Sequence, residues 1–164
     1  MPSLQLRPAV GADVPAVVAL LDTAYRGPGG WTTEAGLIDG PRTSVADIEH
    51  ALPDLLVAEQ DGEVVACCQL RTGGAVAWLG MVAVRPDRQG GGLGRAVIEE
   101  AARRAHGCRE LRLSVVDRRR ELIDWYRRLG FRDTGEREPW PYGDDRFGRP
   151  RVADLGFVVL ARPR

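Results

Sequence analysis

The sequence predicts an α/β protein with a mixed sheet, and three observations lead to this prediction. Apolar and polar residues alternate in several short segments, which is typical of half-buried strands. Other segments carry apolar residues three or four positions apart, which is typical of amphipathic helices. The apolar run 75–84 passes through a glycine-rich turn into such a helix, and another strand follows that helix. Because this connection crosses over the sheet, the two strands are expected to be parallel.

The predicted elements begin with a short strand at 4–7 and a helix at about 13–25, for which Asp13 is a suitable N-cap. A long glycine-rich connection, 26–44, follows and is expected to be mostly irregular. After it come a helix at 45–52, strands at 55–59, 64–70 and 75–84, a helix that reaches Gly107, a strand at 111–115, a helix at about 119–129, and strands that start at 131 and 155. Turn residues at 61–62 and 72–74 predict that the middle three strands are antiparallel neighbours.

Composition indicates one soluble globular domain over residues 1–164, with 44% hydrophobic and 28% charged residues. The 23 basic residues, all of them arginine, balance 23 acidic ones, so charge gives no reason to expect nucleic acid or a membrane as a partner. Cys67 and Cys68 are adjacent on a strand and Cys108 stands alone, which predicts a reducing, cytoplasmic setting and no metal site. Residues 1–7 lack a signal-peptide layout, and no apolar run reaches the length of a membrane span.

The glycine-rich turn predicts an anion site. Four of the five residues from 90 to 94 are glycine, and they stand directly before a helix. Glycine lets a ligand approach the backbone closely, and a helix start offers unpaired N–H donors at the positive end of the dipole, so phosphate is the expected ligand. A plain turn between strand and helix is the alternative. The chain has no lysine, which excludes a P-loop, and the spacing of the glycines fits a dinucleotide fingerprint poorly.

Two motifs together carry a family resemblance. Gln89, Gly92 and Gly94 spell Q-x-x-G-x-G after an apolar strand, and Tyr126 stands shortly before Leu-Gly-Phe at 129–131. This pattern resembles the acetyl-CoA loop and the late helix of the GNAT superfamily, the acetyl-CoA-dependent N-acetyltransferases. The predicted order of strands and helices resembles the GNAT fold over nearly the whole chain. The resemblance implies acetyl-CoA as co-substrate, bound by these residues: Met81, Val82, Ala83, Val84, Arg88, Gln89, Gly90, Gly91, Gly92, Leu93, Gly94, Arg95 and Arg119.

The resemblance also implies catalytic roles. Tyr126 matches the family's general acid, which protonates the departing thiolate, although a core aromatic at helical spacing is the alternative. Backbone N–H groups near Val82 would stabilise the oxyanion. Many relatives have asparagine where this chain has Arg119. That arginine either reaches a cofactor phosphate or is solvated, and the second interpretation is favoured. General-base candidates are Glu34, Glu59, Asp144 and Asp145, and the sequence does not choose firmly among them.

The acceptor pocket is expected between the two irregular segments, 26–44 and 138–150. Both contain aromatic and acidic residues. The predicted contacts are Trp31, Glu34, Trp140, Tyr142 and Asp144, around a small amine of apolar or cationic character. The predicted function is transfer of the acetyl group to a primary amine by direct attack in a ternary complex. Alternatives are a non-catalytic acyl-CoA sensor or interaction module, a protein or peptide acetyltransferase, and a nucleotide-binding module unrelated to coenzyme A. A homodimer is possible by analogy with relatives.

Overall fold

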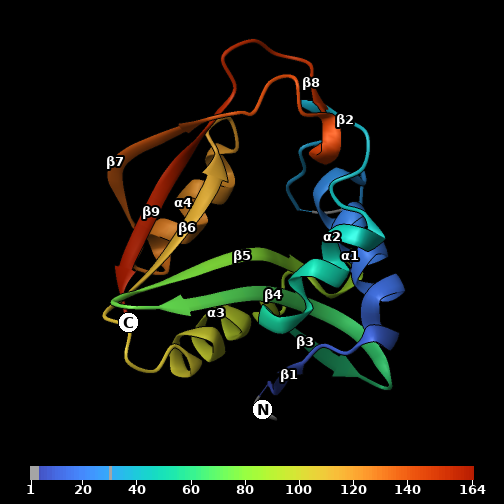
Figure 1. Cartoon of the computed structure of the whole chain (residues 1–164), viewed down its shortest axis with the longest axis vertical. Coiled ribbons are helices and arrows are strands. Elements are labelled where there is room, and N and C mark those ends of the chain that lie inside the picture. The colour runs from blue at the N-terminus through green and yellow to red at the C-terminus, as the bar shows by residue number, and fades with distance from the viewer. Residues whose placement is uncertain (1–3, 30) are drawn as a thin grey trace.

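A seven-stranded sheet forms the centre of the molecule (Figure 1), in the order β1-β3-β4-β5-β6-β9-β7. The computed structural model describes residues 4–29 and 31–164, so Met1–Ser3 and Gly30, which belong to two of the segments discussed above, lie outside the described residues. The strands are β1 (Leu6–Pro8), β3 (Leu55–Gln60), β4 (Glu63–Gly73), β5 (Val76–Val84), β6 (Glu110–Val116), β7 (Arg132–Pro139) and β9 (Gly156–Pro163). The α-helices are α1 (Val14–Arg26), α2 (Val45–Ala51), α3 (Leu93–Arg104) and α4 (Arg120–Arg128).

The predicted fold class and element order are confirmed. The sheet is mostly antiparallel, and β5 and β6, joined through α3, form the expected parallel pair. The structure adds a two-stranded sheet of β2 (Ile38–Asp39) and β8 (Arg149–Pro150), which joins the two segments expected to be irregular. Strands of two residues show no periodicity, so the sequence pattern could not reveal them. The helix expected to reach Gly107 ends at Arg104, and Gly107 lies in a turn with φ of +79°.

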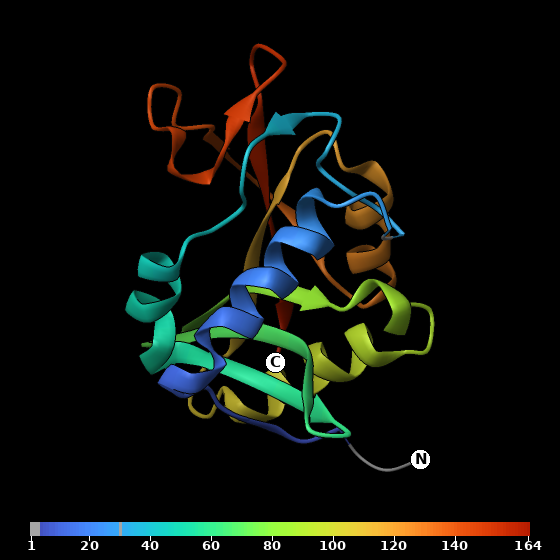
Figure 2. The same ribbon diagram turned by 90° about the vertical axis from the view of Figure 1, so that its right-hand side faces the viewer.

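Helices cover both faces of the sheet, and each face has its own core. Figure 2 shows α1 crossing one face, where α1 and α2 bury apolar residues such as Leu21 and Ile48 against β3 and β4. On the other face, α3 and α4 bury residues such as Ile98 and Ile123. Cys67 belongs to the first core and Cys68 to the second, as expected for adjacent residues of one strand.

Strand β5 contains a bulge, one extra residue that shifts the alternation of side chains along the sequence. Met81 and Val82 stand opposite Cys68 alone, because the register shifts between Cys67 and Gln69. Met81 has φ of +50°, which is unusual for a residue other than glycine. Before the bulge, Ala77 and Leu79 pack in the core under α3, whereas Met81 and Ala83 pack toward α1 and Val84 returns to the α3 side. The bulge therefore changes which side chains and backbone groups face each side at the end of β5.

Strands β5 and β6 then separate. They pair over three residues only, Val76–Trp78 of β5 with Glu110–Arg112 of β6. In Figure 1, β6 and β9 rise away from β4 and β5 beyond this junction. Backbone and side chains of both strands consequently line open space where a regular sheet would be continuous.

Asp13 occupies the N-cap position of α1, but its carboxylate does not cap that helix. Instead it accepts hydrogen bonds from the backbone N–H of Val10 at 2.8 Å and from both terminal nitrogens of Arg7 at 2.8 and 2.9 Å. The predicted capping role is therefore wrong. The hydrogen bonds from Arg7, more than any other contact, lower the pKa of Asp13.

We expect Asp13→Asn to destabilise the protein in a pH-dependent way. A pKa lowered in the folded state gives stability above the unfolded value near pH 3.9, and this stability is lost as the pH falls through the folded pKa. At pH 7 the variant should lose about 1–2 kcal/mol of unfolding free energy, because charge-assisted hydrogen bonds become neutral ones. Urea unfolding at pH 7, 5 and 3 measures this. A difference that stayed constant down to pH 3 would contradict the assignment.

Candidate active site

Two cavities lie where β5 and β6 separate, and they meet at a shared wall. The first has a volume of about 560 Å³ and the second about 390 Å³. Five residues line both: Tyr25, Val82, Arg119, Leu122 and Tyr126. The bulged end of β5, the end of α1 and the inner face of α4 therefore form one junction between two spaces.

The glycine turn lies at the first cavity, as a phosphate site requires. Gly90 and Gly92 have φ of +86° and +83°, a conformation that favours glycine, and both line the cavity. The first helical hydrogen bond in this region runs from the N–H of Ala96 to the carbonyl of Gly92. Within residues 4–29 and 31–164, the N–H groups of residues 90–95 have no hydrogen-bond acceptor. Several adjacent donors at the start of α3 are thus available to an anion.

Gln89 and Gly94 have structural reasons for their place in the motif. The Gln89 side chain donates from Nε2 to the carbonyl of Val84 at 3.0 Å, and its Oε1 accepts from the N–H of Trp31 at 2.8 Å. This side chain therefore fastens the turn to β5 and to the segment after α1. A Cβ on Gly94 would stand 3.3 Å from the Trp125 ring, so a larger residue would require the ring to move by a few tenths of an ångström.

Arginines surround the first cavity. Arg95 and Arg128 line it, whereas Arg88 is exposed beside it. Within the described part of the chain, none of the three forms an ion pair with a carboxylate. Arg128 and Trp125 were missed by the sequence reasoning. Their signal was present, because both lie on the helix of Tyr126, and Trp125 and Arg128 are three residues apart on one face.

Tyr126 lies at the junction of the two cavities. Its side chain is 5% exposed, and its ring packs edge-on against Trp125 and Phe131. Burial, more than any nearby charge, raises the pKa of Tyr126, so the phenol stays protonated. The hydroxyl makes no hydrogen bond to the described residues. It is an available proton donor at the point where the two spaces meet.

The bulged part of β5 forms the opposite side of the junction. Val82, Ala83 and Val84 line the first cavity, and Met81 and Val82 line the second. The carbonyl of Val82 accepts a hydrogen bond from the Tyr25 hydroxyl at 2.9 Å, and the carbonyl of Met81 accepts one from the Cys67 thiol at 3.3 Å. Tyr25 was not predicted as a site residue, because on the sequence it only ends an amphipathic helix.

Arg119 is buried in an ion-pair network, so the interpretation that it is solvated is wrong. It is 6% exposed, and its guanidinium approaches Glu34 at 3.4 Å. Glu34 is 4% exposed and also accepts from Nε of Arg26 at 2.9 Å. Glu34 is close enough to neutralise Arg119, which explains how an arginine is accommodated at a buried position. The network joins the segment after α1 to the start of α4.

The five predicted acceptor residues lie in different places. Glu34 and Trp140 line the second cavity, where Trp140 stacks on Phe157 with ring centroids 5.5 Å apart. Trp31 is 56% exposed and lines the first cavity. Tyr142 and Asp144 line neither cavity.

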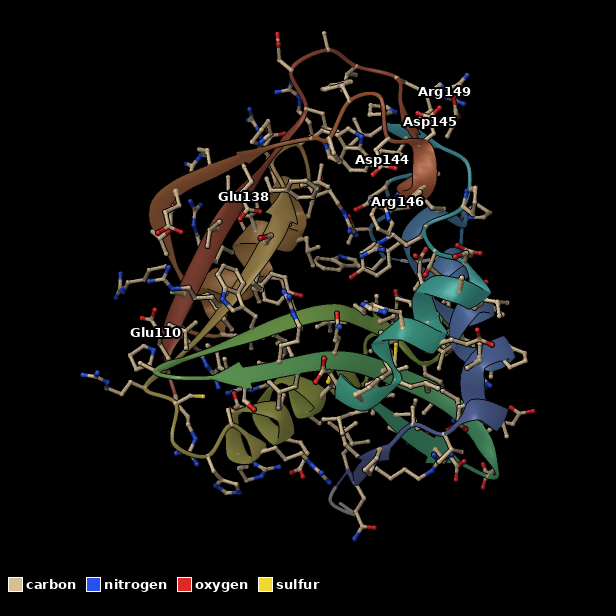
Figure 3. All side chains as sticks on the ribbon, viewed as in Figure 1. Glu110, Glu138, Asp144, Asp145, Arg146 and Arg149 are labelled. Atoms are coloured by element: carbon tan, nitrogen blue, oxygen red, sulfur yellow. The ribbon has the colours of Figure 1, made fainter. Side chains whose placement is uncertain are left out.

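Tyr142 and Asp144 hold their own loop together. The Tyr142 hydroxyl donates to the carbonyl of Val152 at 2.7 Å and accepts from the N–H of Leu155 at 3.0 Å. Figure 3 shows Asp144 and Arg146 together beside the short helix η4 (Asp145–Phe147). Hydrogen bonds from the Arg146 side chain are the main cause of the lowered pKa of Asp144.

The other two base candidates also lie away from the cavities. Glu59 pairs with Arg7, and Asp145 pairs with Arg149. Glu34 is therefore the one carboxylate of the described residues that lines either space. Among residues 4–29 and 31–164, no cluster of metal-binding side chains occurs and no helix has the length and apolar character to cross a membrane.

Comparisons with known proteins agree with this geometry. A family model described as "Acetyltransferase (GNAT) domain" matches residues 52–133. Thialysine N-epsilon-acetyltransferase from Sus scrofa is 39% identical over 59 residues, and so is its Bos taurus counterpart. Each of these matches spans 35% of this chain, and this chain spans only about a third (35%) of the curated relatives' length.

Solved structures show the same fold at low sequence identity. The ribosomal-protein-S18-alanine N-acetyltransferase of Escherichia coli superposes with a TM-score of 0.67 at 23% identity, covering 98% of this chain and 93% of that one. A GNAT superfamily phosphinothricin acetyltransferase of Sinorhizobium meliloti, in complex with AcCoA, gives 0.68 at 18% identity, covering 98% and 88%. With a family model that matches half of the sequence and a fold that agrees throughout, the chain belongs to the GNAT acetyltransferase family.

Proposed function

We propose that this protein transfers the acetyl group of acetyl-CoA to a primary amine, by direct attack within a ternary complex. The observation that carries the proposal is the meeting of two cavities at Tyr126 and Val82. One space ends at a turn with unpaired backbone donors, and the other is bounded by aromatic rings. An enzyme that brings two substrates together without a covalent intermediate needs such a pair of sites with one shared wall.

The first cavity is suited to coenzyme A. Its diphosphate would accept hydrogen bonds from the N–H groups of residues 90–95, and Arg95 and Arg128 would balance its charge, with Arg88 nearby. The pantetheine arm would run along the backbone of Met81, Val82, Ala83 and Val84, as the family resemblance implies. Arg119 is held by Glu34 and lines both cavities, so it would lie beside that arm at the junction.

The reaction needs three events at the junction. The neutral amine attacks the thioester carbonyl carbon and forms a C–N bond, while charge on the carbonyl oxygen is stabilised by a backbone N–H at Val82. The C–S bond then breaks, and the Tyr126 hydroxyl protonates the leaving thiolate. The proton released by the attacking nitrogen leaves through water and restores the Tyr126 phenol, so that protons balance over one turnover.

Glu34 fits a positioning role better than the role of base. Its carboxylate oxygens already accept from Arg26 and Arg119, so removing a proton from an amine would require one of these contacts to break. We therefore propose that Glu34 fixes the two arginines at the second cavity. A small-molecule acceptor is favoured over a protein segment, because about 390 Å³ bounded by Trp140, Phe147 and Phe157 suits a compact molecule.

A direct test is incubation of the purified protein with acetyl-CoA and a panel of amines and peptides, with detection of acetylated products by mass spectrometry and of released CoA by thiol titration. Acetylation of small amines supports the proposal. Tight binding of CoA without any turnover would instead favour the acyl-CoA sensor, and turnover of peptides alone would favour a protein acetyltransferase. A thermal-shift response to NAD or ATP and none to CoA would overturn the cofactor assignment.

The glycine turn gives a matched pair of variants. Gly92 and Gly62 have φ of +83° and +78°, and a Cβ at either would meet no atom within 4 Å. Gly92→Ala and Gly62→Ala should therefore lose similar stability, about 1 kcal/mol each. Only Gly92→Ala should raise the Kd for CoA, by roughly 10-fold or more, because its Cβ and the altered backbone disturb the phosphate donors. Calorimetric titration with CoA measures this, and equal affinities in both variants would contradict the site.

A further inference from the structure

We infer that the acceptor amine also carries a carboxylate, as a free amino acid does, and that Arg42 binds this carboxylate. The inference rests on the proposed function, since it names the acceptor of the same site. It starts from the charges around the second cavity. Arg26, Arg42, Arg71 and Arg119 line it together with the single acidic residue Glu34, an excess of three positive charges. A cationic amine would be repelled by such a lining, whereas an anionic group would be attracted.

Two of the four arginines have no acidic partner among residues 4–29 and 31–164. Glu34 binds Arg26 and Arg119, as described above. Within the described residues, the side chains of Arg42 and Arg71 form neither an ion pair nor a hydrogen bond. In the part of the chain that the structure describes, Nε of Arg119 also has no acceptor, although the side chain is buried. The cavity thus contains more positive than negative charge, and it contains N–H donors without acceptors. A bound carboxylate would supply both the negative charge and the acceptors.

Arg42 is held in position by aromatic rings. Its guanidinium carbon lies 4.9 Å from the centroid of the Tyr25 ring and 5.9 Å from that of Phe147. Its backbone N–H donates to Oδ1 of Asp22 at 2.7 Å, which fixes the chain from which the side chain extends. These contacts reduce the conformational entropy that Arg42 would lose on binding an anion, and they leave its N–H donors free.

The same tyrosine connects Arg42 to the reaction centre. The Tyr25 hydroxyl donates to Val82, and the guanidinium of Arg119 lies 5.4 Å from the Tyr25 ring centroid. A carboxylate at Arg42 would therefore lie one aromatic side chain away from the junction with Tyr126. This spacing suits a compact molecule that carries amine and carboxylate close together.

The rest of the second cavity favours an apolar side chain on that molecule. Apolar and aromatic residues dominate the lining between the arginines, among them Trp78, Leu79, Val115, Trp140 and Phe157. Arg71, on β4, is exposed at this cavity and adds to the attraction of an anion. The expected acceptors are amino acids with apolar or aromatic side chains. This inference keeps the apolar character expected from the sequence and replaces the cationic one.

The test compares acceptors that differ only in the carboxylate: leucine, leucinamide and 3-methylbutylamine, and likewise tryptophan, tryptophanamide and tryptamine. At equal concentrations of neutral amine, the acids should show kcat/KM values roughly 10- to 100-fold above their partners, the range expected of a charge-assisted hydrogen-bonded pair. Equal values, or a preference for the uncharged or decarboxylated amines, would overturn the inference.

Arginine variants locate the effect. Arg42→Gln should raise the KM for leucine by roughly 10-fold or more, and it should lower kcat/KM for leucine roughly 10-fold more than kcat/KM for 3-methylbutylamine. Arg132→Gln is the matched control, because Arg132 is exposed and lines neither cavity. If Arg42→Gln does not fold, Arg71→Gln serves as a second variant, because Arg71 is exposed. It should also raise the KM for leucine more than the KM for 3-methylbutylamine. Equal losses for leucine and 3-methylbutylamine in these variants would contradict recognition of the carboxylate.

A binding measurement separates this inference from the proposed function. Calorimetric titration of leucine and tryptophan into the CoA-saturated protein needs no turnover. Binding that depends on Arg42, without any acetylation, would support the carboxylate site and contradict the proposed transferase function. Acetylation of neutral amines, with no binding of leucine or tryptophan, would support the transferase function and contradict the carboxylate site.

Discussion

Tyr126→Phe is expected to lower kcat by about 100-fold, because a positioned general acid contributes on this scale. The Kd for CoA and the Tm should stay unchanged. The hydroxyl has no hydrogen-bond partner in the described chain, and phenylalanine retains the ring contacts with Trp125 and Phe131. Pre-steady-state release of CoA, measured beside calorimetric binding and thermal unfolding, separates a chemical defect from a structural one.

The pH profile gives a second readout for Tyr126. Since burial raises the pKa of its phenol above the ordinary value of about 10, the wild type should not lose activity through ionisation of Tyr126 anywhere between pH 6 and pH 10. The variant should be slower by a similar factor across this range. A rate unchanged by the substitution, or a Tm lowered in parallel with the rate, would show that the tyrosine serves packing alone.

Glu34→Gln is expected to destabilise the fold by about 3 kcal/mol, because removing one partner of a buried ion pair leaves the other charges uncompensated. Here two buried arginines, Arg26 and Arg119, would lose their shared carboxylate. For a domain of this size the Tm should fall by roughly 6–12 °C. Urea or thermal unfolding measures the loss, and kinetics at a temperature where the variant is folded shows whether the KM for the acceptor rises.

An exposed ion pair provides the control for Glu34. Asp39 and Arg151 pair with both side chains more than half exposed, so Asp39→Asn should leave the Tm nearly unchanged. If Glu34→Gln kept the wild-type Tm and lost kcat in a pH-dependent way, Glu34 would be the general base and the positioning role would be wrong.

Much of the fold could be predicted from the sequence, because most of its helices and strands are long enough to show a regular spacing of apolar residues. The segments that became β3, β4, β5, α3, β6 and α4 each carry an apolar pattern, and glycine or proline lies near their ends except between β6 and α4. The pairing of β2 with β8 could not be predicted, because strands of two residues show no alternation of apolar and polar residues. The partners Ile38 and Pro150 are also far apart in the sequence. The carboxylate of Asp13 accepts hydrogen bonds from Val10 and Arg7 and not from the first turn of the helix. Capping preferences alone do not predict which of these donors an aspartate binds.

Residues of the candidate site could be predicted from the sequence only where they belong to a short local motif. Residues 89–94 and Tyr126 stand in short, recognisable patterns, and the structure brings them to one cavity. Arg119 shows the limit. On the sequence it is one of three consecutive arginines, and its burial depends on Glu34, which comes from a distant loop. The sequence likewise could not predict that the Arg42 guanidinium lacks an acidic partner in the described structure. Whether an arginine is paired depends on residues that are distant in sequence.

The bulge in β5 has a consequence for how this gene can change by insertion or deletion. Loss of one codon at Met81 or Val82 would restore regular pairing with β4, and Ala83 and Val84 would keep their partners Cys67 and Ala66 and therefore their present cores. The sheet itself does not require the extra residue. Its loss would instead remove irregular backbone from the wall that the two cavities share, so selection for this extra residue would act through the site and not through the fold.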